Sequence, residues 1–429
     1  MRILQVVHGF PPDAWAGTEL VTLYLSQALR ARGHEVTVLT RTADPGAEDF
    51  SVREEQLTGL TVVRVVNNHT HTATFRLFYD NSFFNELFLR LVDRLRPDVV
   101  HFQHLAHLSV GLIPLAAALG YPTVLSLHDF FFPCHRIHLI DAQTRLCPGP
   151  ERGVRCVACL QEAAPPDEVL YRFSYMEQAL QAPDLLLAPS TFLARKMQDY
   201  FPALQERLRI VPLGVKPVPP RARDRKPGTP LRVLYAGMLF PPKGAHVLIE
   251  ALKGLPPKAI EVSLYGAVLP FWQPYADRLR EEAQGLPVHF HDAYPHDQLA
   301  SILSRHDVLV MPVICEETFS ILTREALMAG LPVVAARRGA LPAIVQDGVN
   351  GLLFEPENAA DLRRCLARLI TESGRVEQLR VFAPQMKTMD EYAIDLEKIY
   401  LEVSAEPSQE RSQRVARGRD CSVADEERG

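Results

Sequence analysis

The chain has 429 residues, of which 47% are hydrophobic and 23% are charged, and its formal net charge is -5. This composition is typical of an ordinary globular protein, and the length predicts two or three domains at ~150 residues each. The negative net charge argues against a nucleic-acid-binding protein whose affinity rests on overall charge, so we expect no nucleic-acid partner.

The beginning of the chain indicates a cytoplasmic protein. Residues 1–7 read directly as a strand and contain no small-residue cleavage site of the kind that ends a signal peptide. The uncharged residues 108–127 include Pro114, Gly120 and Pro122, which favours a helix followed by a strand over a membrane span. We therefore expect reduced thiols and no export.

The first forty residues predict a strand, a loop, a helix and a second strand. The strand covers residues 3–7, the loop covers 8–17, the helix covers 18–32 and the next strand covers 35–39. Gly17, at the end of the loop, has no Cβ and lets backbone approach a ligand closely, although a simple strand-to-helix turn explains it equally well. No G-x-G-x-x-G follows the first strand, so the dinucleotide fingerprint is absent.

Aromatic residues are concentrated between residues 67 and 96. Several apolar residues there have helical spacing and predict a helix that packs on a sheet: Phe84, Leu87, Phe88, Leu91 and Leu95. Before them, Phe75, Arg76, Phe78 and Tyr79 combine rings with a cation, a pattern that suits a lipid-linked acceptor or a membrane surface. A loop that covers the edge of a sheet is the other interpretation.

Histidines occupy the ends of two predicted strands. The strand at residues 98–101 ends in His101, and the strand at residues 123–127 is followed by His128. In α/β proteins the carboxyl ends of parallel strands carry ligand sites, although many such histidines are structural. We take His128 as the candidate site residue, with His101 and His104 as weaker candidates.

Four of the seven cysteines fall within 26 residues: Cys134, Cys147, Cys156 and Cys159. Four thiolates can close a tetrahedral zinc site, and C-x2-C is a common half-site. Reduced thiols without metal are the alternative, and disulfides are disfavoured in a protein with no export signal. A zinc held by four protein ligands would be structural, because no position stays open for catalysis.

A proline-rich, charged segment at residues 213–230 marks the boundary between two domains. The second domain opens with a predicted strand at residues 231–236, followed by Gly237. A loop then leads through Lys243 and Gly244 into a helix. A lysine at the start of a helix is usually solvated, so this pair alone predicts no site.

The stretch from residue 307 to residue 336 carries the strongest signal. Residues 307–312 read as a buried strand, Glu317 lies on the following loop, and Glu325 lies in the helix predicted at residues 319–329. The free N–H groups of a helix N-terminus suit a phosphate, and ionised carboxylates accept hydrogen bonds from hydroxyl groups. A phosphate beside many hydroxyls describes a nucleotide sugar.

This stretch has the pattern E-x-F-x5-E-A-x3-G-x-P-V-V-A, which resembles the donor-site signature of the retaining glycosyltransferases of family 4. The resemblance covers about residues 1–402 and implies the GT-B fold, an α/β architecture of two Rossmann-like domains that face each other across a cleft. It implies the following parts: an acceptor-side domain at 1–212, a nucleotide-sugar-binding domain at 231–387 after the linker at 213–230, and a helix at 388–403 that crosses back to the first domain. The polar composition of residues 404–429, with few apolar side chains, predicts a disordered tail.

The resemblance also implies an activity. It implies transfer of a sugar from a UDP- or GDP-sugar to a glycan or lipid-linked acceptor, with retention of configuration, in the biosynthesis of a surface polysaccharide or glycoconjugate. His128, Glu317 and Lys243 are the implied catalytic residues, and no cofactor or metal is needed for transfer. The implied substrate-binding residues are Gly17, Gly237, Lys243, Gly244, Thr318, Phe319, Ser320 and Glu325. A peripheral contact with the inner face of a membrane is a further expectation.

Several positions depart from the family pattern. Ala16 and Met238 replace a glycine and an arginine, Thr318 and Ser320 replace glycines, and Ala343 replaces a glutamate. These departures keep two alternatives open. One is a non-catalytic nucleotide-sugar-binding or assembly subunit, and the other is a sugar-nucleotide epimerase or phosphorylase with the same fold.

Overall fold

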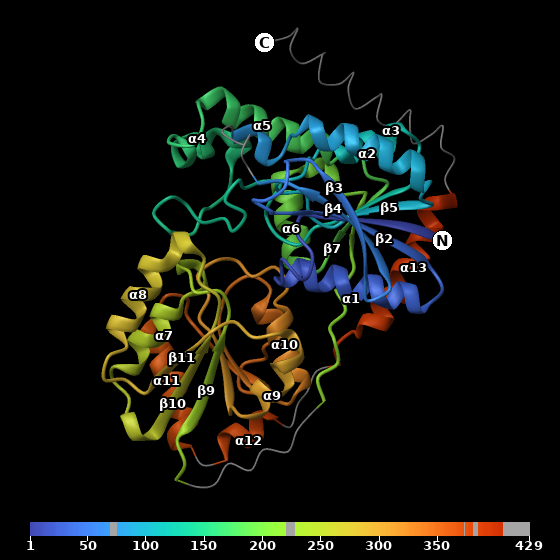
Figure 1. The fold of residues 1–429 in the computed structure, drawn as a ribbon. Coiled ribbons are helices and arrows are strands. Elements are labelled where there is room, and N and C mark those ends of the chain that lie inside the picture. The colour runs from blue at the N-terminus through green and yellow to red at the C-terminus, as the bar shows by residue number, and fades with distance from the viewer. Residues whose placement is uncertain (69–74, 220–227, 373, 381–384, 406–429) are drawn as a thin grey trace. The chain divides into compact units, whose positions relative to one another are not determined.

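Two sheets organise the chain, each in its own compact unit (Figure 1). The computed structural model describes residues 1–68, 75–219, 228–372, 374–380 and 385–405. The first unit comprises residues 1–137, 147–214 and the chain from Lys387, and the second comprises residues 138–146 and 215–386. The sequence analysis placed residues 138–146 in the first domain, whereas their contacts group them with the second unit. Parts of the predicted linker and almost all of the predicted tail, residues 220–227 and 406–429, lie outside the described residues.

The first unit contains an eight-stranded sheet in the order β3-β4-β2-β1-β5-β6-β7-β8. Neighbouring strands are parallel, except that β3 pairs with β4 in the antiparallel direction. The strands are β1 (Arg2–Val7), β2 (Glu35–Thr42), β3 (Val52–Leu57), β4 (Leu60–Val66), β5 (Val99–Phe102), β6 (Thr123–Ser126), β7 (Leu185–Ala188) and β8 (Leu208–Ile210).

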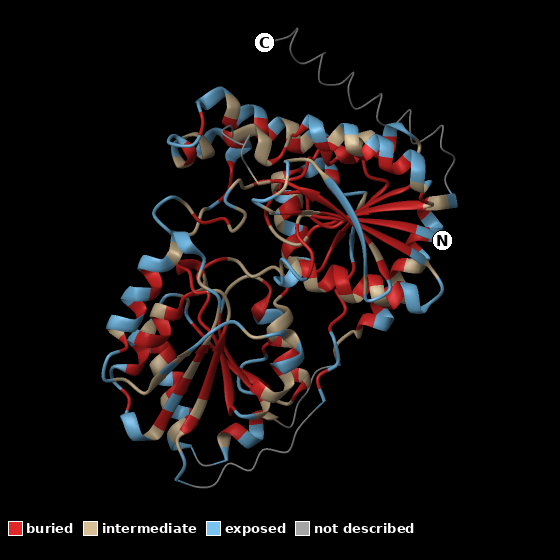
Figure 2. Ribbon diagram, viewed as in Figure 1, coloured by how far each residue is buried: buried red, intermediate tan, exposed pale blue. Residues whose placement is uncertain are grey.

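Helices cover both faces of this sheet, so its central strands are buried on both sides (Figure 2). In Figure 1, α2, α3 and α5 lie on one side of the sheet, and α1 and α13 lie on the other. Phe84, Phe88 and Leu91 of α2 are buried, as their helical spacing predicts. The helices are α1 (Gly17–Ala31), α2 (Ser82–Leu95), α3 (Leu112–Ala118), α4 (Val154–Leu160), α5 (Pro166–Ala179), α6 (Thr191–Tyr200) and α13 (Met389–Ala405).

The last described helix, α13, is part of the first unit. Glu397 of α13 accepts hydrogen bonds from Arg32 and, at 3.1 Å, from Nε2 of His34. The hydroxyl of Tyr400 lies 2.6 Å from Nδ1 of His101 inside the sheet. Gly214 lets the chain pass close beneath this helix, because a Cβ there would lie 2.6 Å from the carbonyl oxygen of Thr388.

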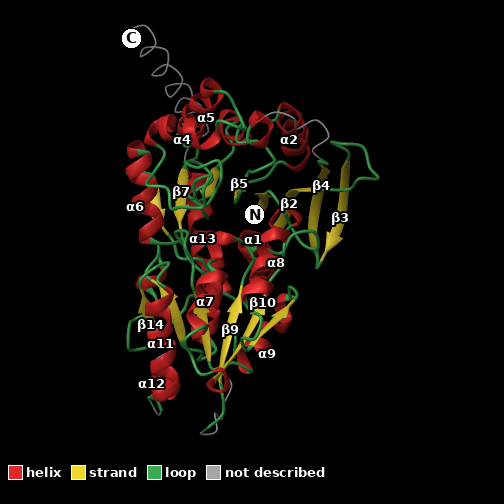
Figure 3. Ribbon diagram, turned by 90° about the vertical axis from the view of Figure 1, so that its left-hand side faces the viewer, coloured by secondary structure: helices red, strands yellow, loops and turns green. Residues whose placement is uncertain are grey.

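The second unit contains a six-stranded, fully parallel sheet in the order β11-β10-β9-β12-β13-β14. Its strands are β9 (Leu231–Ala236), β10 (Ile260–Tyr265), β11 (Val288–His291), β12 (Val308–Met311), β13 (Val333–Ala336) and β14 (Gly351–Phe354). Its helices are α7 (Ala245–Leu252), α8 (Gln273–Glu282), α9 (Leu299–Ser304), α10 (Ile321–Met328), α11 (Ala359–Thr371) and α12 (Arg375–Arg380). Figures 1 and 3 show α7, α8 and α11 on one side of the strands, and Figure 1 shows α9 and α10 on the other.

Each parallel sheet has a point at which the order of its strands reverses. In the first unit this point lies between β1 and β5, and in the second it lies between β9 and β12. Ligands of open α/β sheets bind outside the carboxyl ends of the strands at such a point, because the connecting loops diverge there and leave a crevice. The topology therefore directs attention to the loops after β1, β5, β9 and β12.

Among the residues that the structure describes, no helix is both long enough and apolar enough to cross a membrane.

Candidate functional site

In the second unit, the two predicted motif loops lie side by side. The loop after β9 carries Lys243, and the loop after β12 carries Glu317. Strands β9 and β12 are neighbours in the sheet, so their loops leave the same edge at the switch point. The backbone N–H groups of Ile314 and Cys315 donate to the carbonyl oxygen of Pro242 at 2.9 and 3.3 Å. These hydrogen bonds fix one loop against the other.

Gly244 has a structural reason to follow Lys243. Its φ is +72°, and a Cβ at this position would lie 1.8 Å from the carbonyl oxygen of Pro312 at the end of β12. Only glycine fits both the left-handed backbone and the close approach. The Lys-Gly pair therefore places the ammonium group of Lys243 at the switch point.

Lys243 and Glu317 form an ion pair between Nζ and Oε1. Their side chains are 27% and 11% exposed, so both charges are partly withdrawn from water and both still reach it. Burial alone would lower the pKa of Lys243, but the neighbouring Glu317 carboxylate raises it above its usual value. The site therefore holds a permanent cation beside a group that accepts hydrogen bonds.

The backbone of Glu317 is held by the turn after β13. Gly339 in this turn has φ +57°, and a Cβ there would lie 2.1 Å from the carbonyl oxygen of Glu317. The N–H of Ala340 donates to the same oxygen at 2.7 Å. Gly339 thus positions Glu317.

Glu325 lies in α10 and is only 3% exposed. Its Oε1 atom lies 2.8 Å from Nε2 of His296, which follows β11. Burial raises the pKa of the nearby Tyr294, and the Glu325 carboxylate raises it further. The rings of Tyr265 and His291 stack with centroids 4.3 Å apart, at the carboxyl ends of β10 and β11. An aromatic and polar wall therefore lies beside the second glutamate.

The residues around Glu317 show how the departures from the family pattern are accommodated. Ser320 has φ +59°, the left-handed region that favours glycine, and its hydroxyl lies 2.7 Å from that of Thr323. Phe319 is buried, and the guanidinium carbon of Arg324 lies 3.4 Å from the centroid of its ring. Thr318 is half-buried beside them.

The structure does not place a second cation at Met238. The loop between β9 and α7 begins with Gly237, whose N–H donates to the carbonyl oxygen of Tyr265 at 3.0 Å. The backbone carbonyl of Met238 accepts a hydrogen bond from the hydroxyl of Tyr235 at 3.3 Å. Gly237 and Met238 therefore shape this loop, and Lys243 supplies its charge.

In the first unit, four ionisable side chains form a polar cluster at the carboxyl edge of the sheet: His8, Glu19, His104 and Asp129. Nε2 of His8 lies 3.3 Å from Oε1 of Glu19, and Nε2 of His104 lies 3.1 Å from Oδ2 of Asp129. The rings of His8 and His104 have centroids 4.2 Å apart. The cluster surrounds the switch point between β1 and β5.

Burial perturbs this cluster and leaves some of its atoms without partners. Burial, reinforced by His104, holds the pKa of His8 well below its usual value, and burial raises the pKa of Glu19. Within the described residues, Nδ1 of His8 and Oε2 of Glu19 are buried and have no hydrogen-bond partner. Such atoms are costly to bury unless a ligand or water completes them.

His128 follows β6 and lies next to this cluster. Its Nε2 is 2.7 Å from Oε1 of Gln103, and Nε2 of Gln103 donates to Oε1 of Gln5 at 2.9 Å. Because this amide oxygen only accepts, Nε2 of His128 carries the proton and Nδ1 is the acceptor. Burial lowers the pKa of His128 to about 4, against the opposing effect of Asp129.

His101 is a structural residue. It is fully buried. Its Nδ1 lies 2.6 Å from the Tyr400 hydroxyl, and its Nε2 lies 2.8 Å from the Ser126 hydroxyl. Burial lowers its pKa to about 3. Of the three histidines considered from the sequence, His104 and His128 lie at the ligand edge, and His101 joins α13 to the sheet.

Gly17 is the exposed first residue of α1. Ala16 occupies the N-cap position of this helix, with φ -78° and ψ -179°, an extended conformation that any residue adopts. Alanine therefore replaces the family's first glycine without backbone strain. The side chain of Ala16 makes no cap hydrogen bond to this helix.

Four residues of the candidate site have no place in the sequence analysis: His8, Glu19, Asp129 and His296. Glu19 lies two residues after Gly17, in the first turn of the helix that follows the first strand, and that position was its only signal. His296 had no signal beyond its place after the strand predicted at residues 287–291. The pairing of His296 with Glu325 joins residues 29 positions apart.

The four clustered cysteines are free thiols and half-buried. Burial raises the pKa of Cys156 to about 12, and Cys134 and Cys147 raise it further. In the ranges that the structure covers, no three histidine, cysteine or carboxylate side chains are arranged so that they could hold a metal ion. The zinc hypothesis gains no geometric support here and stays a prediction.

Comparison with known proteins supports the family resemblance across most of the chain. The family model described as "Glycosyltransferase Family 4" matches residues 15–218, and the model described as "Glycosyl transferases group 1" matches residues 230–372. Glycogen synthase of Mycobacterium tuberculosis is 26% identical over 411 residues, which cover 91% of this chain and 91% of that protein.

Other relatives match over a shorter region. Sulfoquinovosyl transferase SQD2 of Arabidopsis thaliana is 27% identical, over 65% of this chain and 50% of the relative. A D-inositol 3-phosphate glycosyltransferase of Streptomyces bingchenggensis is 32% identical, over 47% of this chain and 49% of the relative. The chain thus spans about half the length of these curated relatives.

Solved structures share the fold. Sucrose-phosphate synthase of Thermosynechococcus elongatus has a TM-score of 0.70 at 20% identity and covers 94% of this chain and 99% of its own. WaaG, a glycosyltransferase involved in lipopolysaccharide biosynthesis, has a TM-score of 0.63 at 18% identity, over 94% of this chain and 100% of its own. With its two parallel-sheet α/β units and its two family matches, this chain belongs to the family 4 glycosyltransferases of the GT-B fold.

Proposed function

We propose that this protein is a retaining glycosyltransferase that moves a sugar from a UDP- or GDP-sugar to a glycan or lipid-linked acceptor without a catalytic metal. The observation that carries this proposal is the Lys243–Glu317 pair at the switch point of the second unit. An ammonium group beside a carboxylate matches the two chemical parts of a sugar diphosphate, its charge and its hydroxyls.

The donor would bind by exchanging partners within this pair. The diphosphate would take over the N–H groups of Lys243 and the uncapped N-terminus of α10, whose helix dipole favours an anion. Glu317, released from Lys243, would accept hydrogen bonds from sugar hydroxyls. Glu325, already held by His296, would accept from the ribose, and the Tyr265–His291 stack would border the base.

The chemistry follows from where charge appears. When the bond between the anomeric carbon and the phosphate oxygen breaks, negative charge grows on the departing diphosphate. Lys243 and backbone N–H groups would stabilise that charge in place of a metal. His128, whose pKa is lowered by burial, lies at the ligand edge of the first sheet and suits a hydrogen bond with a sugar hydroxyl. Retention of configuration is proposed from the family pattern.

Related structures support a UDP-sugar donor. Anabaena HepE, with a TM-score of 0.62, is described in complex with UDP and glucose. A trehalose-6-phosphate protein of E. coli, with a TM-score of 0.61, is described as bound with UDP-2-fluoro glucose. We further propose a role in surface polysaccharide or glycoconjugate synthesis, in the cytoplasm and at the inner face of a membrane.

A thermal-shift panel of nucleotides and nucleotide sugars, followed by a donor-hydrolysis assay, tests this function. A ligand at a hundred times its dissociation constant stabilises the native protein by ~2.7 kcal/mol, a rise of roughly 5–10 °C in melting temperature for a domain of this size. Glu317→Gln should bind the nucleotide but lose at least a hundredfold in turnover, whereas its half-buried neighbour Glu316→Gln should keep it. If no UDP- or GDP-sugar shifts the melting temperature, the proposal fails.

A non-catalytic donor-binding subunit is the second candidate. Met238, in place of the family arginine, leaves Lys243 as the cation assigned to the diphosphate, and this favours binding over turnover. Binding of UDP-sugars with no release of free sugar, with or without a crude lipid extract as acceptor, would support the subunit. Measurable hydrolysis or transfer would exclude it.

A further inference from the structure

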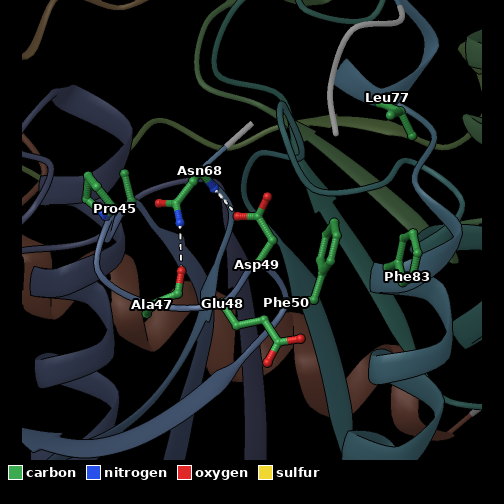
Figure 4. Close-up of a pocket in the computed structure, with 9 residues that line it drawn as sticks. Pro45, Ala47, Glu48, Asp49, Phe50, Asn68, Leu77 and Phe83 are labelled. Atoms are coloured by element: carbon green, nitrogen blue, oxygen red, sulfur yellow. Dashed lines mark hydrogen bonds between the residues drawn. The ribbon is translucent and has the colours of Figure 1, made fainter. Parts of the chain in front are cut away.

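A cavity of about 870 Å³ lies in the first unit (Figure 4). Its wall is largely apolar and includes Ala43, Pro45 and Leu77. The rings of Phe50 and Phe83 stack against each other in it, with centroids 4.5 Å apart and planes 11° apart. The volume falls within the ~300–1,000 Å³ of small-molecule pockets, and Phe83 remains 55% exposed, so the structure leaves an apolar surface uncovered.

The rim of this cavity is held in place by Asn68. Its Nδ2 donates to the carbonyl oxygens of Asp44 and Ala47 at 2.8 and 3.1 Å, and its Oδ1 accepts from the N–H of Asp44 at 2.7 Å. Its own N–H donates to Oδ1 of Asp49 at 2.6 Å, and Figure 4 shows the bonds to Ala47 and Asp49. The loop that follows β2 is therefore tied to the end of β4, and the cavity does not require a ligand to order this rim.

The charges of the described wall residues disfavour an anionic occupant. Glu48 and Asp49 line the cavity, and no lysine, arginine or histidine is among the described residues that line it. A phosphate or carboxylate would therefore meet like charges and find no cation. Stacked phenyl rings and small apolar side chains instead suit a hydrocarbon chain, which gains by leaving water.

The cavity and the polar cluster lie along the same edge of the first sheet. Ala43 and Asn68 follow β2 and β4, and the residues of the cluster follow β1, β5 and β6 or begin α1. The order β4-β2-β1-β5-β6 makes these strand ends neighbours. Arg41 lies two residues before Ala43; burial lowers the pKa of its guanidinium, and the carboxylates of Glu19 and Asp13 oppose that effect.

We infer that the acceptor of the proposed reaction is amphipathic, with a hydrocarbon chain in this cavity and a hydroxyl-bearing head at the polar cluster. The inference rests on the proposed function, because it names the class of its second substrate. The unpartnered Oε2 of Glu19 and Nδ1 of His8 accept hydrogen bonds from the head, and Phe50 and Phe83 contact the chain. A lipid-linked or alkyl-linked acceptor fits both regions, whereas a free glycan fills only the polar one.

Binding of alkyl glycosides to the full chain tests this inference. The probes are n-octyl and methyl glycosides of glucose, galactose and mannose, each below its micelle concentration, measured by titration calorimetry. Each buried CH2 group strengthens binding roughly fourfold, so an octyl chain with four buried groups should bind at least a hundredfold more tightly than methyl. Equal binding of octyl and methyl glycosides, or no binding of any octyl probe, overturns the inference.

Two variants assign the parts of the acceptor to the two regions. Phe83→Asp puts a charge into the cavity at an exposed position and should weaken octyl binding at least tenfold without affecting methyl glycosides. Leu89→Asp, on the same helix and 39% exposed but not in the cavity wall, is the matched control and should bind octyl glycosides like the native protein. Glu19→Gln should weaken octyl and methyl glycosides by the same factor, since it touches only the head.

The results separate this inference from the proposed function. Native protein that hydrolyses a UDP- or GDP-sugar but does not distinguish octyl from methyl acceptors keeps the function and rejects the amphipathic acceptor. A second result is also possible: octyl glycosides bind the native protein and not Phe83→Asp, but no nucleotide sugar binds. This result keeps the assignment of the cavity and rejects the proposed function. Melting temperatures of the variants within 3 °C of native show that the fold is intact.

Discussion

Replacing Lys243 with alanine should abolish most nucleotide binding and leave the fold nearly unchanged. The ammonium group is assigned to the diphosphate, and a hydrogen bond to a charged group contributes about 1.5–3 kcal/mol. Its loss corresponds to a roughly 10- to 150-fold weaker affinity for UDP or GDP. The carboxylate of Glu317, no longer neutralised, would also repel the diphosphate, so we expect the upper end of this range.

The cost to stability should be much smaller. Both partners of the pair reach water, with side chains 27% and 11% exposed, so Glu317 can be solvated when Lys243 is removed. The loss should therefore lie nearer the roughly 0–1 kcal/mol of exposed pairs than the ~3–5 kcal/mol of fully buried ones. A fall of about 2–4 °C in melting temperature is the expected size.

Titration calorimetry with UDP and GDP, together with the donor-hydrolysis rate, measures the effect. Lys258→Ala is the matched control, because this lysine is exposed and belongs to the same unit. It should bind nucleotide like the native protein. If Lys243→Ala keeps native affinity for both nucleotides, Lys243 does not hold the diphosphate, and the role of the pair as the donor site is refuted.

Four further outcomes are expected. His296→Ala should raise KM for the donor several-fold more than kcat falls, because it frees the side chain of Glu325 to move; equal kinetics with native protein would remove this contact from the site. Sugar transfer should continue in the presence of EDTA. Loss of activity in EDTA that Mg²⁺ or Mn²⁺ restores would contradict the proposal that Lys243 and backbone N–H groups alone stabilise the charge of the departing diphosphate. If the cysteine cluster binds zinc, elemental analysis should find about one zinc per chain, and Cys156→Ser with Cys159→Ser should lose it together with part of the stability; metal-free native protein would establish reduced thiols. The pKa of His101 is about 3 in the folded protein, so between pH 6.5 and 3 only the unfolded chain protonates this imidazole. The free energy of unfolding should therefore fall by up to ~1.4 kcal/mol per pH unit from pH 6.5 towards pH 3. If His101→Gln shows the same pH dependence of unfolding free energy as the native protein, this expectation is wrong.

The sequence was most informative where local pattern and local geometry coincide. Lys243 and Gly244 were predicted to lead directly into a helix, and α7 begins at Ala245. The loop position of Glu317 followed from the buried strand before it. The helix expected from residue 319 begins at Ile321, because Ser320 adopts a left-handed conformation that does not continue a helix. The apolar residues 331–336 predict a further strand, which in the structure begins at Val333, after a proline that has no N–H to donate to a ladder.

What the sequence could not predict depends on contacts between distant segments. The pairing of His296 with Glu325 joins two connections that leave different strands, and neither residue has a local pattern that points to the other. The same holds for His8 with His104 and for the link from His128 through Gln103 to Gln5. Hydrophobic periodicity predicts on which face of its own helix or strand a residue lies. Only the order of the strands in the sheet decides which strand ends are neighbours.

Residues 138–146 illustrate a different limit. They leave the first unit between two of the clustered cysteines, and Ile140 packs with Ile314 and Cys315 of the second unit, beside the loop that carries Glu317. Asp141 closes their turn by accepting from the N–H groups of Gln143 and Arg145, each at 2.9 Å. This turn chemistry predicts a hairpin, but nothing in the segment shows which unit it joins.

The position of α13 constrains the order in which the protein can acquire its structure during synthesis. This helix supplies Tyr400 to the interior of the first sheet and Glu397 to Arg32, yet it emerges from the ribosome only after the whole second unit. The β1, β5 and β6 region therefore lacks one of its covering layers while the remaining chain is being made, and His101 lacks one of its two hydroxyl partners. A fragment that stops at the domain linker would expose this apolar face to water. The first unit thus starts to be translated before the second unit and is completed after it, so its apolar face stays open to chaperones that recognise incomplete chains.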